Sequence, residues 1–434
     1  MVEASGPLRS WIASAADSEF PLENIPFGAF MNPRLNQVHC CTRIGDMVID
    51  LSILEHERLL SEGPVMQNVD HHVMCEPTLN KFMDLGKDAR IEVRAALQSI
   101  FAEGSTKLTD ALKEASMFPV SEVSLRMPVF IRDYTDFYSS YSHAYNVGCM
   151  IRGADNAIQP NWLHLPVGYH GRASSIVVSG TPVRRPKGQV TADKKVPTWS
   201  ECKRMDLELE MGTIIGKGNA MGDPIPVSEA RDHIFGHCIL NDWSARDMQV
   251  WEYVPLGPFN AKNFCSTISP WIITPEALAP FKVALPAQDP ALLPYLQDND
   301  LSSYNIDLEM CIKTPTMSEP HVMAKSNMRY LYYSVPQTIA HHSVTGCNMS
   351  VGDMLGTGTI SGPEKSQYGS MLELCWGGKE EIELPNGEKR KFLADGDSVV
   401  LRGVCQGNGY KIGFGECEGT VIPAHDDARY MSSK

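Results

Sequence analysis

The chain contains 434 residues, of which 43% are apolar and 21% are charged. This composition is typical of a protein with a packed core and excludes disorder along the whole chain. Lysine and arginine together number 38 and aspartate and glutamate 52, so the net charge is −14. Because negative charge repels phosphate backbones and anionic lipid, we expect neither nucleic acid nor a membrane surface as a partner.

Two further features concern the compartment. No apolar run reaches the roughly 20 residues that span a bilayer, and the N-terminal segment lacks the basic region and unbroken apolar stretch of a signal peptide. The twelve cysteines are scattered and include no Cys-x-x-Cys pair. This pattern favours buried free thiols over disulfides or zinc ligands. The sequence therefore predicts a cytoplasmic protein.

The first 120 or so residues differ in pattern from the rest. Residues 43–52 read as a strand, and a helical stretch extends from about residue 88 to 115, where Val93, Leu97 and Ile100 recur at helical spacing. Ser105 or Thr106 is the predicted cap of a second helix. A weakly periodic stretch follows, and we expect a domain boundary near residues 121–127.

Strand patterns dominate the remainder of the chain. Short apolar or alternating runs occupy residues 174–180, 205–216 and 305–313, and the last 65 or so residues resemble a meander with Asn-Gly and Asp-Gly turns. The clearest helix lies near residues 329–343, where Pro336 starts or kinks it. The predicted fold class is mainly β with minor α, with a small N-terminal domain and a large β-rich C-terminal domain.

The most informative motif is acidic. Between residues 206 and 210 carboxylates alternate with leucines, which on a strand places Glu208 and Glu210 on one face. Two like charges on one face repel, so this face is either solvated or binds a hard cation such as calcium or magnesium. Asp136 among tyrosines and Asp242 after an apolar run favour the cation, and Arg246 follows closely as a compensating charge.

A second acid interrupts an apolar run. Glu373 lies in residues 369–376, which we interpret as a strand. A buried carboxylate needs a charged or hydrogen-bonding partner, and a histidine would serve. Thirteen histidines compete for this role. His143 follows Asp136 by seven residues and is expected near the cation.

Long blocks of the sequence resemble the fumarylacetoacetate hydrolase family. They lie at residues 133–153, 161–189, 207–212, 241–259 and 358–362, and the likeness extends from about residue 21 to the final meander. The resemblance implies an SH3-like barrel domain over residues 1–125, a catalytic β-roll domain over residues 126–434, and a homodimer. It also implies metal-dependent hydrolysis of the carbon–carbon bond of 4-fumarylacetoacetate to fumarate and acetoacetate, the last step of tyrosine and phenylalanine catabolism.

Site residues follow from the same resemblance, position by position. The implied calcium ligands are Asp136, Glu208, Glu210 and Asp242, and the implied magnesium site comprises Asp242, Lys262 and Ser266. The implied catalytic residues are His143, oriented by Glu373, with Arg246, Gln249 and Lys262 stabilising an oxyanion. The implied substrate contacts are Tyr138, Arg152, Gln249, Tyr253 and Thr359.

Two rival functions remain open. Members of the wider superfamily act as acylpyruvate-type hydrolases, decarboxylases or isomerases on smaller diketo acids, and a metal-bound dimer without catalysis is the second alternative. The long N-terminal domain and residues 251–259 favour the hydrolase over the former, and the presence of both His143 and Glu373 favours it over the latter. One departure from the family pattern is Cys265-Ser266, where glycine and threonine are usual; serine retains the hydroxyl and cysteine adds bulk.

Overall fold

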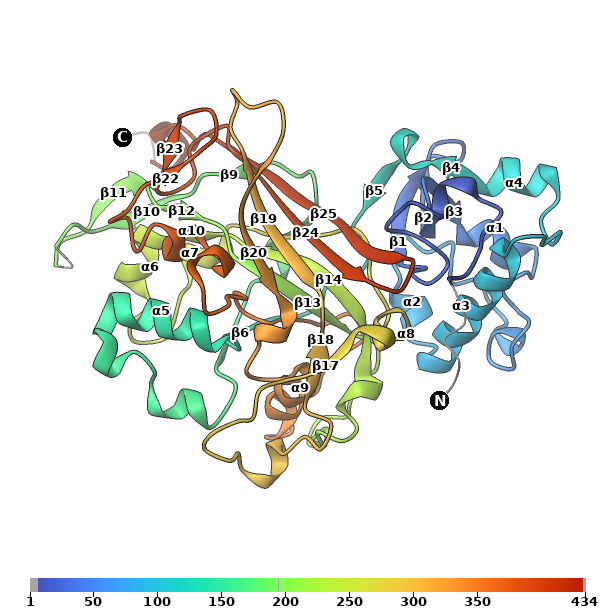
Figure 1. Cartoon of the computed structure of the whole chain (residues 1–434), viewed down its shortest axis with the longest axis horizontal. Helices are drawn as coiled ribbons and strands as arrows, with labels where there is room; N and C mark the ends of the chain where they lie inside the picture. Colours follow the sequence, from blue (N-terminus) through green and yellow to red (C-terminus); the bar gives the residue numbers. More distant parts are fainter. Residues whose placement is uncertain (1–6, 194, 432–434) are drawn as a thin grey trace.

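Two domains of unequal size form the structure, a computed structural model that describes residues 7–193 and 195–431 (Figure 1). The N-terminal domain, blue in the figure, is built on one antiparallel sheet. In spatial order its strands are β4 (Met117–Pro119), β3 (Met47–Asp50), β2 (Gln37–Ile44), β1 (Phe27–Asn32) and β5 (Ser124–Arg126). The expected sheet-rich architecture with minor helix is confirmed.

Helices complete the N-terminal domain. They are α1 (Leu51–His56), α2 (Asn80–Met83), α3 (Lys87–Phe101) and α4 (Asp110–Ser116). Along α3 the side chains of Val93, Leu97 and Ile100 are all buried. The 3.6-residue period of the sequence therefore does mark the face that packs into the core.

The start of α4 differs from the prediction. Its N-cap is Thr109, whose Oγ1 accepts a hydrogen bond from the Leu112 amide at 3.3 Å. Ser105 and Thr106 instead lie in the irregular segment after α3, which continues past the buried Leu108. The helix therefore begins only after Leu108, at the residue whose side chain caps its first turn.

The C-terminal domain contains two large sheets. The first has the spatial order β7 (Gly168–His170), β6 (Tyr134–Phe137), β21 (Met354–Gly356), β13 (Leu209–Ile215), β14 (Ile234–Asp242), β16 (Ser266–Ile268) and β8 (Ile176–Val178). The second has the order β20 (His321–Asn327), β19 (Asp307–Lys313), β24 (Ser398–Gln406), β25 (Lys411–Ile422) and β9 (Val183–Arg184). Every residue of β13 and β14 is buried, so the first sheet is covered on both faces at its centre.

Smaller elements surround these sheets. Four two-stranded pairs are β10 (Lys187–Val190) with β11 (Thr198–Glu201), β12 (Met205–Asp206) with β15 (Ser244–Ala245), β17 (Lys282–Ala284) with β18 (Ser302–Tyr304), and β22 (Ile382–Glu383) with β23 (Lys389–Arg390). The helices are α5 (Tyr141–Arg152), α6 (Arg246–Glu252), α7 (Asn260–Asn263), α8 (Pro275–Leu278), α9 (Val335–Ser343) and α10 (Met371–Leu374).

In the C-terminal domain one local pattern predicted its element correctly and another did not. Pro336 lies in the first turn of α9, as expected. The run around Glu373, however, is not a strand but the short helix α10. The Ser370 hydroxyl caps the helix locally by accepting the Glu373 amide hydrogen, and the distant carboxylate of Asp206 accepts the amide hydrogens of Met371 and Leu372. Together these hydrogen bonds override the strand-like composition.

Cysteine chemistry agrees with the prediction of free thiols. All twelve cysteines, which lie within the described residues, are unpaired, and nine of them are buried. No helix in the described ranges is long and apolar enough to cross a membrane.

The two domains are packed together through aromatic side chains. Phe235, at the start of β14, lies 5.9 Å between ring centroids from both Phe27 and Phe82 of the N-terminal domain. Beside them, Arg90 of α3 forms two hydrogen bonds with Glu276 of α8, at 3.1 and 2.7 Å. The N-terminal domain thus covers the face of the first sheet near β14, one of the strands that carry the site.

Replacement of Phe235 by alanine tests this packing. We expect Phe235→Ala to lower the free energy of unfolding by about 3 to 5 kcal/mol, because it empties a fully packed aromatic position. The measurement is chemical denaturation followed by fluorescence and circular dichroism. Phe130→Ala, at a side chain that is 65% exposed, is the control and should change stability by less than about 0.5 kcal/mol. Equal losses in the two variants would contradict the role assigned to Phe235.

Candidate active site

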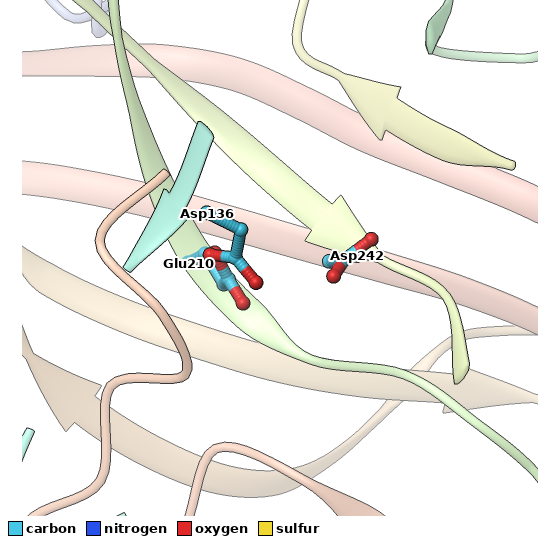
Figure 2. Close-up of side chains that lie close together, drawn as sticks. All are labelled: Asp136, Glu210 and Asp242. Atoms are coloured by element: carbon cyan, nitrogen blue, oxygen red, sulfur yellow. The ribbon is translucent and has the colours of Figure 1, made fainter. Parts of the chain in front are cut away.

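Three carboxylates from neighbouring strands converge in the first sheet of the C-terminal domain. Asp136 of β6, Glu210 of β13 and Asp242 at the end of β14 each offer an oxygen within 4.8 Å of the others (Figure 2). β21 lies between β6 and β13. A Cβ atom at Gly356 of β21 would lie only 2.9 Å from Asp136 Oδ1 and 3.1 Å from Glu210 Oε2. Only glycine therefore lets these two carboxylates meet across the strand.

Burial makes this acidic cluster unusual. All three side chains are at most 5% exposed, which excludes a solvated outer face. Burial, together with the charge of Asp242, raises the pKa of Asp136 well above its usual value, and burial and the charge of Asp136 do the same for Glu210. Asp136 Oδ1 and Glu210 Oε1 have no hydrogen-bond partner within the described residues. Unpaired, buried carboxylate oxygens are the donor set that a hard divalent cation takes.

Glu208 lies beside the cluster but faces different groups. Its Oε1 accepts hydrogen bonds from Arg246 Nη2 and Thr359 Oγ1, both at 2.8 Å, and its Oε2 contacts Lys262 Nζ. Burial raises the pKa of Glu208, but Arg246 and Lys262 outweigh it and hold that pKa well below its usual value. Glu208 is thus an ionised link between the acidic cluster and the cations. The structure brings together three of the four expected calcium ligands and places Glu208 next to them.

Asp242 joins the cluster to the second group of expected residues. Its Oδ1 accepts from Ser266 Oγ at 2.8 Å, because Ser266 lies opposite it in the β14–β16 register. Its Oδ2 accepts from Lys262 Nζ at 2.6 Å and from the Tyr169 hydroxyl at 2.9 Å. Tyr169 was not predicted, since nothing in its local sequence distinguishes it from other tyrosines. Burial raises the pKa of the Cys265 thiol to about 12, so this neighbour stays protonated.

His143 forms a pair with Glu373. It lies in the first turn of α5, and its Nδ1 is 2.7 Å from Glu373 Oε2. Three further donors, Asn146 Nδ2, Ser361 Oγ and Ser370 Oγ, hydrogen-bond to the same carboxylate at 2.8 to 2.9 Å. Burial raises the pKa of Glu373, but His143 and these donors outweigh it and lower that pKa overall. When Nδ1 of His143 carries the proton and donates a hydrogen bond to Glu373, Nε2 is the ring nitrogen that carries the lone pair.

Arg246 is the first residue of α6, and its guanidinium donates hydrogen bonds to three side chains. Its Nε donates to Asp206 Oδ2 at 2.9 Å, its Nη2 to Glu208 as above, and its Nη1 to Gln249 Oε1 at 3.1 Å. Lys262 is also buried; burial lowers its pKa, but Asp242 and Glu208 outweigh this and raise it. Both cations are therefore charged beside the base.

The remaining predicted residues lie outside the acidic cluster and the His143–Glu373 pair. Tyr138 packs its ring edge against His143 with centroids 5.3 Å apart. Tyr253 lies half-buried at the end of α6. Arg152 is exposed at the end of α5, where it donates to the carbonyls of Asn156 and Ala157 at 3.0 and 2.6 Å.

The site combines a histidine oriented by a carboxylate, two positively charged side chains and a cluster of buried carboxylate oxygens. Such a site can deprotonate water and stabilise the oxyanion that forms when water adds to a carbonyl group. These are the functions of a hydrolase.

Sequence comparison gives the particular family. Residues 134–422 match the family model described as fumarylacetoacetate (FAA) hydrolase C-terminal, and residues 23–128 match that described as fumarylacetoacetase N-terminal.

Full-length relatives agree. Fumarylacetoacetase of Dictyostelium discoideum is 51% identical over 425 residues, covering 96% of this chain and 98% of the relative, and that of Homo sapiens is 50% identical over 418 residues, covering 96% and 99%. Among solved structures, fumarylacetoacetate hydrolase from Exiguobacterium antarcticum is similar in fold, with a TM-score of 0.51, 15% identity, and coverage of 92% of this chain and 99% of that one. The chain belongs to the fumarylacetoacetase family, which confirms the resemblance.

The raised pKa values of the acidic cluster predict how a cation binds. Without a cation Asp136 and Glu210 retain protons to higher pH than ordinary carboxyl groups, and a divalent ion must displace them. We therefore expect calcium affinity to rise with pH until both groups are ionised, with proton release on binding. Calorimetry in buffers of different ionisation enthalpy measures that release. In Glu210→Gln the release should shrink and calcium should bind more weakly; pH-independent affinity of the unaltered chain would contradict the prediction.

Proposed function

We propose that the acidic cluster, the His143–Glu373 pair and the cations around Glu208 together hydrolyse the carbon–carbon bond of 4-fumarylacetoacetate to fumarate and acetoacetate, the reaction that follows from the full-length relatives. The observation that supports these roles best is the buried His143–Glu373 contact at 2.7 Å beside the carboxylates. A substrate ketone between base and cations would meet every group that the reaction needs.

The base acts first. His143 Nε2 is 3.6 Å from Glu208 Oε1, too far for a hydrogen bond, so its lone pair remains available. It takes a proton from water, whose oxygen attacks the ketone carbonyl carbon of the fumaryl group. The carbonyl electron pair moves to oxygen, and Arg246, Gln249 and Lys262 stabilise this oxyanion, an effect worth about 3 to 4 kcal/mol per donor.

Bond cleavage completes the reaction. As the carbonyl reforms, the electron pair of the carbon–carbon bond leaves with the acetoacetate fragment and the fumaryl carbon becomes a carboxylic acid. Lys262, which is charged, is our candidate to protonate the departing carbanion. When bound, a divalent cation would supply Lewis-acid stabilisation to the leaving enolate.

We further propose Ca²⁺ as the ion held by Asp136, Glu208, Glu210 and Asp242. For Mg²⁺, Asp242 and Ser266 would supply oxygen ligands. Lys262 would contribute its charge instead of a ligand atom, since an ammonium group has no lone pair and its pKa is raised.

Substrate recognition completes the proposed site. Tyr138, Arg152, Gln249, Tyr253 and Thr359 are the proposed contacts. The exposed guanidinium of Arg152, at the end of the same helix that carries His143, is suited to bind a carboxylate of the dianionic substrate.

The finer architecture is also proposed. The N-terminal domain, residues 1–125, would be an SH3-like barrel, and residues 126–434 a β-roll that dimerises with a second copy in the cytoplasm. The end of β5 at Arg126 and the start of β6 at Tyr134 support a division in this part of the chain.

A chelation assay tests the proposed function. Loss of fumarylacetoacetate absorbance is followed with untreated protein, with chelated protein, and after addition of calcium or magnesium. We expect turnover that falls on chelation and returns with the ion. Unimpaired turnover after complete chelation would refute the metal role. No turnover by folded, metal-supplied protein would redirect the proposal to acylpyruvate-type hydrolysis or decarboxylation of smaller diketo acids, and then to a structural dimer.

The base has its own test. We expect His143→Phe to lower kcat by at least about 100-fold, since general-base catalysis contributes about 100- to 10,000-fold, with the fold intact by circular dichroism. His341→Phe is the matched control. His341 is a half-buried histidine whose Nδ1 lies 3.0 Å from the Tyr295 hydroxyl, and its loss should leave kcat unchanged because the proposed reaction gives it no role. Near-normal turnover by His143→Phe would remove this residue from the mechanism.

A further inference from the structure

Asp206 is a buried acid to which the proposed reaction assigns no role. Its side chain is 0% exposed, and its carboxylate accepts four hydrogen bonds. Oδ1 accepts from the amides of Leu207 and Met371, both at 2.9 Å, and Oδ2 accepts from the Leu372 amide at 3.1 Å and from Arg246 Nε at 2.9 Å. A carboxylate removed from water this completely is stable only because every lone pair is used.

Two of these hydrogen bonds reach the helix that carries Glu373. Met371 and Leu372 are the first two residues of α10, and Glu373 follows directly. Amide groups in the first turn of a helix have no partner within the helix itself. Asp206 supplies that partner from a strand 165 residues away in sequence. It therefore fixes where α10 begins and, with it, the position of the carboxylate that orients His143.

The fourth hydrogen bond joins Asp206 to Arg246, which belongs to the proposed oxyanion site. Because Asp206 accepts Nε of Arg246, the plane of the guanidinium is set, and Nη2 and Nη1 then point to Glu208 and Gln249. Backbone pairing of β12 with β15 brings Asp206 near the start of α6. That pairing does not determine the orientation of the Arg246 side chain, which its contacts with Asp206, Glu208 and Gln249 do.

We propose that Asp206 is a positioning residue, which holds the helix of the Glu373–His143 pair and the guanidinium of Arg246 in one fixed arrangement without touching the substrate. The inference rests on the roles proposed above for Arg246 and Glu373. It joins the base and the oxyanion site through a single side chain. A small displacement of either group relative to the other would then lower the rate of the chemical step more than substrate binding.

The test is a comparison of kcat with KM in Asp206→Asn. The amide keeps the shape of the side chain but replaces one oxygen by an NH2 group, which cannot accept a hydrogen bond. Each oxygen of Asp206 accepts two of the four hydrogen bonds, so two contacts become repulsive whichever oxygen is replaced. We expect kcat to fall by about 10- to 100-fold, because displacements near 1 Å cost up to about 100-fold. KM and calcium affinity should change less than about threefold, since Asp206 contacts neither the proposed substrate residues nor the acidic cluster.

Asp397→Asn is the matched control for lost stability. Asp397 is equally buried and pairs with an arginine in the same way, accepting from Arg390 Nε at 2.8 Å and Nη2 at 3.0 Å and from the Ala394 amide at 2.8 Å. It lies outside the site. Both variants should melt at a lower temperature, and only Asp206→Asn should lose kcat. An equal fall of kcat in both variants would overturn the inference.

Three further variants cover the other outcomes. Asp206→Glu keeps the charge but moves the carboxylate by one methylene group, so it too should lower kcat at least tenfold; unaltered kcat in either folded Asp206 variant overturns the inference. Arg246→Lys distinguishes the two proposals. If it loses activity while the Asp206 variants do not, the inference fails and the proposed function stands; if it and Glu373→Gln retain full activity, both fail.

Discussion

The site depends on the balance of charge in a region without solvent. Five acids, namely Asp136, Asp206, Glu208, Glu210 and Asp242, are buried close to two cations, Arg246 and Lys262. Each buried ion costs several kcal/mol unless its neighbours compensate it. Asp206 and Glu208 form ion pairs with Arg246, and Glu208 also contacts Lys262, whereas Asp136 Oδ1 and Glu210 Oε1 have no hydrogen-bond partner within the described residues. One part of this buried region is therefore paired with positively charged side chains, and the other part, around Asp136 and Glu210, requires a bound cation or protons.

Glu208 lies between the acidic cluster and the histidine base, and so keeps these two parts of the site apart. It contacts Lys262 on one side and lies 3.6 Å from His143 on the other. The base consequently faces an ionised carboxylate that is already paired with cations. At this distance the Glu208 carboxylate forms no hydrogen bond with His143 Nε2, whereas Glu373 Oε2 lies 2.7 Å from Nδ1.

Sequence patterns predicted the parts of this arrangement that local chemistry determines. Alternating carboxylates in residues 206–210, the acid after an apolar strand at Asp242 and the helical spacing of α3 are all local. The contacts that complete the site are not. Asp206 lies 165 residues from its partner Met371, and Tyr169 lies 73 residues from Asp242. Such pairs leave no trace in a single sequence, and for the same reason the helix α10 was mistaken for a strand.

The missing side chain at Gly356 has a consequence for which ions the cluster would accept. The wall between Asp136 and Glu210 is the bare backbone of β21, and neighbouring strands are held about 4.8 Å apart by their hydrogen bonds. Because β6 and β13 are two such spacings apart, the sheet fixes the separation of the backbones from which the two carboxylates extend across Gly356. A gap of this kind favours ions of a particular radius, so the spacing of the strands would determine whether a large or a small divalent ion fits between the carboxylates.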